Sequence, residues 1–271
     1  MPEAPSVARA NRNGGTMTRQ TMGSGHFDQA FREQFWELLR WRRDVRNFKP
    51  EPLAPDLLAE ILSSTRFAPS VGLSESWRYV LVSRPEIRRQ VRENFETANA
   101  RALAGYSGEK AALYARLKLA GLDSAPVHLA AFADRATAQG SRLGCQTMPE
   151  TLDYSVVAAI TTLWLTARAH GVGMGWVSIL DPDRIRAILA VPAEWHLVAY
   201  LCIGYPEGES PVPELERAGW ENEVLGSHWL NAETRTGPNC RTADNLAVHA
   251  SATSPNRAVT GHRFRFLSVS R

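Results

Sequence analysis

Residues 163–179 read LWLTARAHGVGMGWVSI, and this stretch carries the strongest fold signal in the sequence. Its first half continues a helical pattern of apolar residues, a glycine at 171 suits a left-handed helix end, and 174–179 is typical of a strand. The run passes from helix to strand and has Trp176 where a dinucleotide fingerprint needs its last glycine, so it is not a Rossmann motif. The three glycines either pack the backbone closely against a flat ligand or form a flexible connection.

The flanking sequence predicts helices that alternate with buried strands. Apolar residues at three- and four-residue steps predict helices at 27–41, 55–67, 85–100, 108–120, 152–170 and 182–190. Short apolar runs predict strands at 79–82, 127–133, 174–179 and 197–205. Pro55 and the pair Asp181–Pro182 are typical helix starts. Alternation alone favours a parallel sheet with helices around it, although the sequence leaves the strand directions open.

The net charge of +3 is concentrated at the two ends of the chain. Residues 1–26 carry a net charge of +2 and residues 226–271 carry +4, which leaves −3 for the part between them. Both ends are polar and lack apolar periodicity, so we predict disorder at 1–26 and 226–271 around a folded domain at 27–225. The charge of that domain argues against nucleic-acid binding.

Cysteine usage and hydropathy point to a cytoplasmic protein. Cys145, Cys202 and Cys240 form no Cys-x-x-Cys pair, which favours free thiols in a reducing compartment. The sequence holds no apolar stretch long enough for a transmembrane helix and no secretory signal, so no membrane association is expected. The histidines show no metal-binding spacing, and no metal is expected.

The segment RRDVR at 42–46 is the first candidate site, placed where a predicted helix ends. Arg42, Arg43 and Arg46 offer the planar, bidentate donors that suit a phosphate, although cations at a helix end also complement the helix dipole. Asp44 stands among them and should be ionised, which favours a hydrogen-bond acceptor or base. The alternative for Asp44 is a surface ion pair.

The loop APSVG at 68–72 is the second candidate. It resembles the Gly-x-Ser-x-Gly hydrolase elbow only partly, because that elbow needs a strand before it and a helix after it. As a loop it brings backbone N–H groups and the Ser70 hydroxyl close to a ligand, with Gly72 allowing close approach.

Taken together and in order, these segments resemble the FMN framework of the nitroreductase superfamily over about residues 27–225. Within it the chain is most similar to the BluB-type 5,6-dimethylbenzimidazole synthases, through RRDVR (42–46), PEPL (50–53), APSVG (68–72), SGEK (107–110), LKLAG (117–121), LWLTARAHGVGMGWVSI (163–179) and PELERAGW (213–220). The resemblance implies an α+β fold of three α/β layers, with a mixed central sheet flanked by helices. It also implies a homodimer with FMN at the subunit interface.

The resemblance assigns roles to individual residues. Asp44 and Ser178 match the pair that supports FMN fragmentation, with Asp44 an acid or base near the ribityl chain. The FMN-binding positions that it implies are Arg42, Arg43, Asp44, Val45, Arg46, Ser70, Gly72, Lys110, Leu119 and Ser178. Glu75 departs from the pattern, because it places a charge where those sequences carry a Gln-Pro pair near the flavin.

The implied reaction consumes reduced FMN and molecular oxygen. The flavin ring is cut, the ribityl C1′ becomes C2 of 5,6-dimethylbenzimidazole (the lower ligand of vitamin B12), and erythrose 4-phosphate leaves. FMN is then the substrate, and a separate flavin reductase supplies it reduced. Two alternatives stay open: an NAD(P)H-dependent nitro- or enone reductase on the same fold, and a flavin-binding protein without turnover.

Overall fold

The computed structural model describes residues 25–117 and 120–223. The predicted disordered segment 226–271, most of the segment 1–26, and Leu119 lie outside these ranges. The chain divides into two units, Met1–Glu223 and Val224–Arg271, and the second lies wholly outside the described residues. Each helix in the described part is too short or too polar to span a lipid bilayer.

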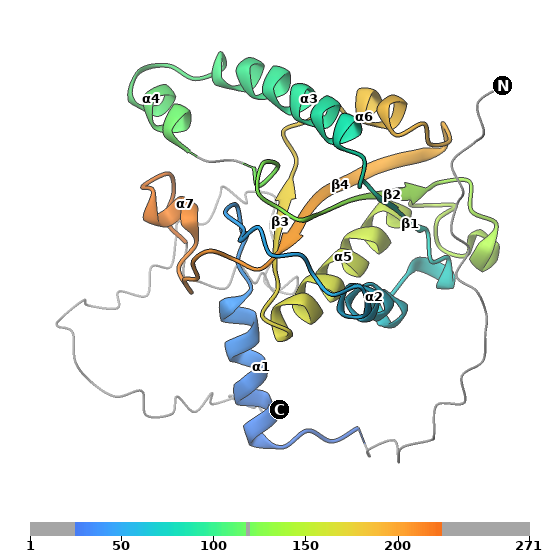
Figure 1. Cartoon of the computed structure of the whole chain (residues 1–271). Coiled ribbons are helices and arrows are strands. Elements are labelled where there is room, and N and C mark those ends of the chain that lie inside the picture. The colour runs from blue at the N-terminus through green and yellow to red at the C-terminus, as the bar shows by residue number, and fades with distance from the viewer. Residues whose placement is uncertain (1–24, 118–119, 224–271) are drawn as a thin grey trace, which may run out of the picture. The chain divides into compact units, whose positions relative to one another are not determined.

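A four-stranded sheet forms the centre of the fold (Figure 1). Its strands are β1 (Trp77–Leu81), β2 (Val127–Asp134), β3 (Gly173–Val177) and β4 (Trp195–Gly204), in the order β1-β2-β4-β3. All three pairings are antiparallel, and β2 is irregular opposite β4 between Ala131 and Phe132. The predicted mixed sheet is thus antiparallel within its four strands, and in the described residues its parallel component is a single bridge between Asp44 and Met174.

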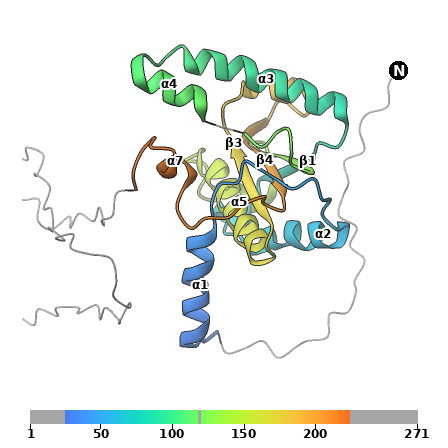
Figure 2. The ribbon, with the colours of Figure 1, turned by 60° about the vertical axis from the view of Figure 1, so that its left-hand side comes forward.

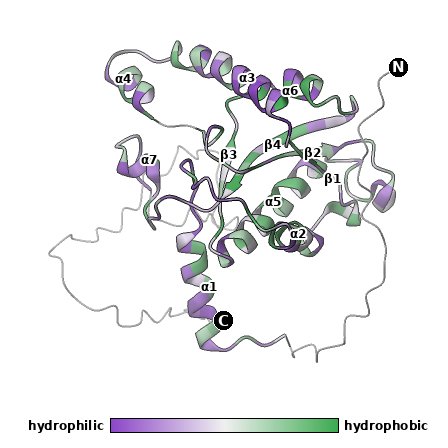
Figure 3. Cartoon of the chain, viewed as in Figure 1, coloured by the Kyte–Doolittle hydropathy of each residue, from purple (hydrophilic) through white to green (hydrophobic). Residues whose placement is uncertain are grey.

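Helices cover both faces of the sheet, which confirms the three-layer α+β arrangement. On one face, α2 (Pro55–Ser63) and α5 (Thr151–Ala169) cover Leu129 and Ala131. On the other, α3 (Pro85–Leu103) and α6 (Pro182–Ile188) cover Ala130 and Phe132. The alternation along β2 follows from the two-residue period of a strand. In Figure 3 the hydrophobic colour is concentrated on β3, β4 and α5.

Local sequence signals set the ends of several elements. Gly171 has a φ of +71° just after α5, and the backbone N–H of Val172 donates to the carbonyl of Ala167, as expected for a left-handed helix end. The Asp181 carboxylate accepts from the N–H of Arg184 and caps α6. α2 is shorter than predicted, because the chain tightens into a 3₁₀ turn at Ser64–Phe67.

Three helices lie outside the two covering layers. They are α1 (Gln29–Trp41), α4 (Gly108–Arg116) and the short α7 (Glu214–Arg217), which the sequence did not predict. α1 projects away from the sheet in two views (Figures 1 and 2). None of its residues is buried, and Phe27, Phe31 and Phe35 form a stacked row that stays exposed.

Candidate active site

The segment that follows α1 is held against β3 by glycines. The N–H of Val45 donates to the carbonyl of Met174 over 3.0 Å, next to the parallel bridge of Asp44. A Cβ at Gly175 would lie 2.2 Å from the carbonyl oxygen of Val45, and one at Gly173 would lie 2.8 Å from its side chain. The expectation that these glycines face a flat ligand or a loose connection is therefore wrong for this pair, because the backbone of residues 44–45 fills the space that they leave.

This packing fixes the Asp44 carboxylate at both oxygens. Oδ1 accepts from the backbone N–H of Trp176 over 2.9 Å, and Oδ2 accepts from Nε of Arg46 over 2.8 Å. The Arg46 side chain is 10% exposed and that of Asp44 is 33% exposed. A carboxylate with two donors, one of them a guanidinium, is held as an acceptor, as the sequence predicted, and its partial exposure leaves it accessible to a ligand.

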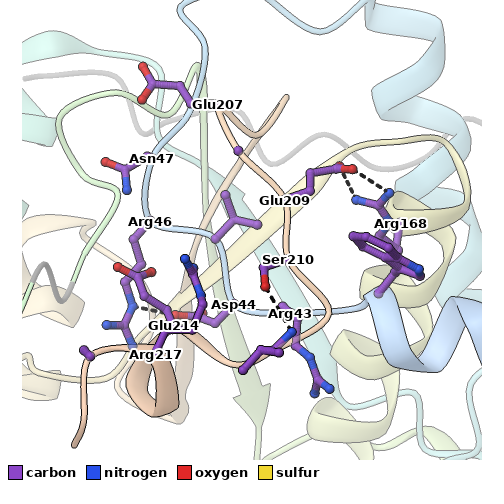
Figure 4. A pocket seen from close by; sticks show the side chains of 15 residues that line it. Arg43, Asp44, Arg46, Asn47, Arg168, Glu207, Glu209, Ser210, Glu214 and Arg217 are labelled. Atoms are coloured by element: carbon purple, nitrogen blue, oxygen red, sulfur yellow. Dashed lines mark hydrogen bonds and ion pairs between the residues drawn. The ribbon is translucent and has the colours of Figure 1, made fainter. Parts of the chain in front are cut away.

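A cleft of about 590 Å³ opens beside this pair (Figure 4), within the size range of small-molecule sites. One wall is the segment 43–47 that follows α1. The opposite wall is the irregular segment 207–212 and α7, which brings residues from two distant parts of the sequence together. The cleft also includes Trp41 and Arg168, from the last turns of α1 and α5.

The charges around the cleft balance. Its lining includes Arg43, Arg46, Arg168 and Arg217, and it also includes Asp44, Glu207, Glu209 and Glu214. Several guanidiniums already have partners. Nε of Arg43 donates to the carbonyl of Pro211 over 2.7 Å, and both terminal nitrogens of Arg168 contact the Glu209 carboxylate. Two of the four arginines, Arg46 and Arg168, are thus paired with carboxylates of the cleft itself, whereas Arg43 forms its ion pair with Glu223 outside the lining.

Arg42 lies apart from the cleft lining. Its guanidinium is 4.8 Å from the ring centre of Trp164, a cation–π arrangement on the side of α5. Burial, and then the positive charge of Arg43, lower the pKa of Arg42 from its usual value. The structure thus brings Arg43 and Arg46 into the cleft with Asp44 and Val45, and it places Arg42 against the helix.

Ser70 and Gly72 lie in another part of the fold. The Ser70 hydroxyl accepts from the N–H of Glu75 over 3.2 Å, within the loop itself. Gly72 has a φ of +55°, and a Cβ there would lie 2.5 Å from the carbonyl oxygen of Leu143, so the APSVG loop packs tightly against residues 140–143. Glu75 is exposed, and none of these residues lines the cleft.

Lys110 and Ser178 also lie outside the cleft lining. The Lys110 ammonium lies 3.8 Å from the ring centre of Trp220 and donates to the carbonyl of the same residue over 2.8 Å. Tyr106 and Tyr114 both pack edge-to-face with Trp220, so α4 contacts the segment that follows α7. Ser178 is exposed just beyond the end of β3. Leu119 lies outside the described residues.

Sequence reasoning did not single out Arg168, Glu209 or Arg217, although they lie on the cleft. Arg168 and Arg217 fall inside stretches that carried the family resemblance, which was the available signal. Glu209 gave no signal, because its partner Arg168 is 41 positions away and the pairing depends on the path of the loop after β4.

The fold and the arginine-lined cleft define an α+β protein of the nitroreductase class, and the chain belongs to the nitroreductase family, whose model matches residues 39–205. It is 53% identical over 196 residues to the 5,6-dimethylbenzimidazole synthase of Rhodospirillum rubrum, covering 72% of this chain and 93% of that protein. It is 46% identical to a 5,6-dimethylbenzimidazole synthase of Rhodobacter capsulatus, covering 75% of this chain and 98% of that protein.

Solved structures support the fold. Oxidised iodotyrosine deiodinase, bound to FMN and 3-iodo-L-tyrosine, has a TM-score of 0.57 at 22% identity over 72% of this chain and 99% of that chain. A BluB-like flavoprotein from Clostridium difficile has a TM-score of 0.51 at 20% identity over 64% of this chain and 90% of that chain. At these identities the likeness concerns the arrangement of the backbone.

Proposed function

We propose that this protein is an oxygen-dependent 5,6-dimethylbenzimidazole synthase that takes reduced FMN as its substrate and receives it from a separate flavin reductase. The observation that carries the proposal is the Asp44 carboxylate, held by Arg46 and by the backbone of β3 on the wall of the cleft. It occupies the position that the family resemblance gives to the fragmenting acid or base. The 53% identity to a protein of that name supports the same assignment.

The donor set of the cleft suits FMN. A phosphate and a chain of hydroxyl groups need charged donors at one end and polar partners along their length. The charged donors are the guanidiniums of Arg43, Arg46, Arg168 and Arg217. The polar partners on the same cleft are Asn47 and Ser210. A cleft of about 590 Å³ is also large enough for a small-molecule ligand.

Within this site each residue has a chemical task. Reduced FMN supplies the electrons and oxygen accepts them. Arg43 and Arg46 hold the anionic end of the substrate, and Arg46 keeps the Asp44 carboxylate oriented. Asp44 takes or returns a proton at its carboxylate, a step that typically contributes about 10²- to 10⁴-fold to a rate. Ser178, beyond the end of β3 and outside the cleft lining, would supply a hydroxyl hydrogen bond to the flavin.

We also propose that the working unit is a homodimer. The aromatic row Phe27, Phe31 and Phe35 along α1 is exposed, and Trp36 on the same helix is 71% exposed. Apolar surface of this kind is costly in water and is typical of a subunit interface. A second copy would cover it.

The deciding experiment is an incubation of the purified protein with excess chemically reduced FMN, followed by admission of air and chromatography. We expect 5,6-dimethylbenzimidazole to accumulate in proportion to the FMN lost. An NAD(P)H-dependent reductase would instead reduce bound FMN rapidly when NADH is added and would form no benzimidazole. A flavin-binding protein without turnover would return the flavin intact, and either result contradicts the proposal.

A further inference from the structure

The ion pair between Arg168 and Glu209 has a different environment from the other charge pairs on the cleft. Arg168 projects from the last turn of α5, and its side chain is 19% exposed. Both of its terminal nitrogens meet the Glu209 carboxylate, Nη1 with Oε1 and Nη2 with Oε2, the latter over 3.2 Å. This is the two-pronged geometry in which a guanidinium binds either a carboxylate or a phosphate.

Glu209 is the more exposed partner of the pair. It lies in an irregular segment between β4 and α7, and its side chain is 40% exposed. Among the described residues its carboxylate contacts Arg168 alone. Asp44, by contrast, is fixed by the backbone N–H of Trp176 as well as by Arg46. Releasing Glu209 costs one solvent-accessible ion pair, whereas releasing Asp44 breaks part of the packing against β3.

The charges that line the cleft explain why release of Glu209 would favour the binding of a phosphate. An organic phosphate carries a charge of about −1.5 to −2 near neutral pH. It would enter a cleft lined by four carboxylates, in which Arg46 and Arg168 are already paired with Asp44 and Glu209. Movement of Glu209 out of the cleft removes one negative charge from the lining and exposes a preformed fork of donors on Arg168, which then matches a second anion without rearrangement.

We infer that Glu209 is an internal competitor for the phosphate of the substrate, and that Arg168 exchanges the Glu209 carboxylate for that phosphate when the flavin binds. Arg168 is then a phosphate-binding residue and Glu209 sets how strongly the site discriminates phosphorylated from unphosphorylated flavins. This inference rests on the proposed function, because it requires FMN to bind in this cleft.

The test compares two ligands that differ in the phosphate alone. Reduced FMN and reduced riboflavin are titrated against the full-length protein by equilibrium dialysis without oxygen, so that no reaction proceeds. For Glu209→Gln we expect FMN to bind about tenfold more tightly, the scale of one charge-assisted hydrogen bond, with riboflavin unchanged. For Arg168→Gln we expect FMN to bind about tenfold more weakly, again with riboflavin unchanged.

Glu207→Gln is the matched control, because Glu207 lies two positions away on the same cleft and has no ion pair in the described residues. Its removal tests the effect of charge without freeing a guanidinium, and we expect a smaller change in the FMN-to-riboflavin ratio. The inference is overturned if Glu209→Gln weakens FMN, if it alters both ligands equally, or if Glu207→Gln matches it. Failure of the wild-type protein to bind FMN would overturn the proposed function as well.

Discussion

The backbone N–H of Trp176 donates to Oδ1 of Asp44 over 2.9 Å, which joins the segment after α1 to the strand that precedes Ser178. The two residues are 132 positions apart, and their contact exists because Gly175 leaves room for the carbonyl of Val45. The strand β3 therefore positions Asp44 at its edge and leads directly into Ser178, the other member of the proposed catalytic pair. The position of the acid depends on glycine packing as much as on its own hydrogen bonds.

Removing the charge of Asp44 should stop the reaction and keep the fold. In Asp44→Asn the amide oxygen still accepts from Trp176, whereas proton transfer is lost, so we expect benzimidazole formation to fall about 10²- to 10⁴-fold. The measurement is chromatographic yield after aerobic incubation with reduced FMN. Ser178→Gly should lose product in the same way. Asp123→Asn, in an exposed ion pair with Arg92, is the control, and wild-type yield in Asp44→Asn would contradict the assignment.

A methyl group at position 175 should push residues 44–45 away from β3. In Gly175→Ala the new Cβ meets the Val45 carbonyl oxygen at 2.2 Å, so the backbone must shift, and we expect a loss of about 1–3 kcal/mol in the free energy of unfolding. Urea denaturation measures it. Gly208→Ala is the control, because Gly208 lines the same cleft and its Cβ would enter open space. Equal stability of the two variants would show that Gly175 is not required for this packing.

The free energy of unfolding should fall as the pH is lowered, because the pKa of His128 is lower in the folded protein than in the unfolded chain. Its side chain is 1% exposed, and Nδ1 lies 3.0 Å from the hydroxyl of Tyr200, while Nε2 has no partner in the described residues. Burial, and then the positive charge of Arg88, lower the pKa of His128 to about 4. In the unfolded chain a histidine titrates near pH 6.5, so between these values the unfolded state binds the extra proton.

The contribution of His128 to the free energy of unfolding is therefore fully present above about pH 6.5. It is lost as the pH falls toward 4, by up to about 3 kcal/mol. Urea unfolding from pH 4 to 7 should show a flatter dependence for His128→Gln than for the wild type. His196→Gln is the comparison, because His196 is exposed beside Asp153. An unchanged slope in His128→Gln would mean that the acid sensitivity arises elsewhere.

A charge in the aromatic row of α1 should prevent self-association. Phe31 stacks between Phe27 and Phe35 and is 44% exposed, so Phe31→Glu places a carboxylate in the proposed interface. We expect sedimentation to show a dimer for the wild type and a monomer for this variant. Glu33→Gln, on the same helix, should remain dimeric. A dimeric Phe31→Glu protein would place the interface on another face.

The sequence alone determined the elements and several of their ends. Apolar periodicity located the covering helices and the four strands, and Pro55, Asp181 and Gly171 mark boundaries that the structure reproduces. These signals are local, because a cap or a left-handed turn depends on residues within one turn of the chain. The family resemblance was equally a property of short stretches, and it was confirmed by the match over residues 39–205.

The tertiary structure decided what the sequence left open. The strands are antiparallel because of the path of the connections between them. Gly173 and Gly175 leave the space that Val45 occupies. The Arg42 guanidinium packs on the ring of Trp164, whereas Arg168 lines the cleft and pairs with the Glu209 carboxylate from a distant loop. Such pairings arise between residues far apart in the chain, and their geometry follows from how the layers pack, so no local pattern encodes them.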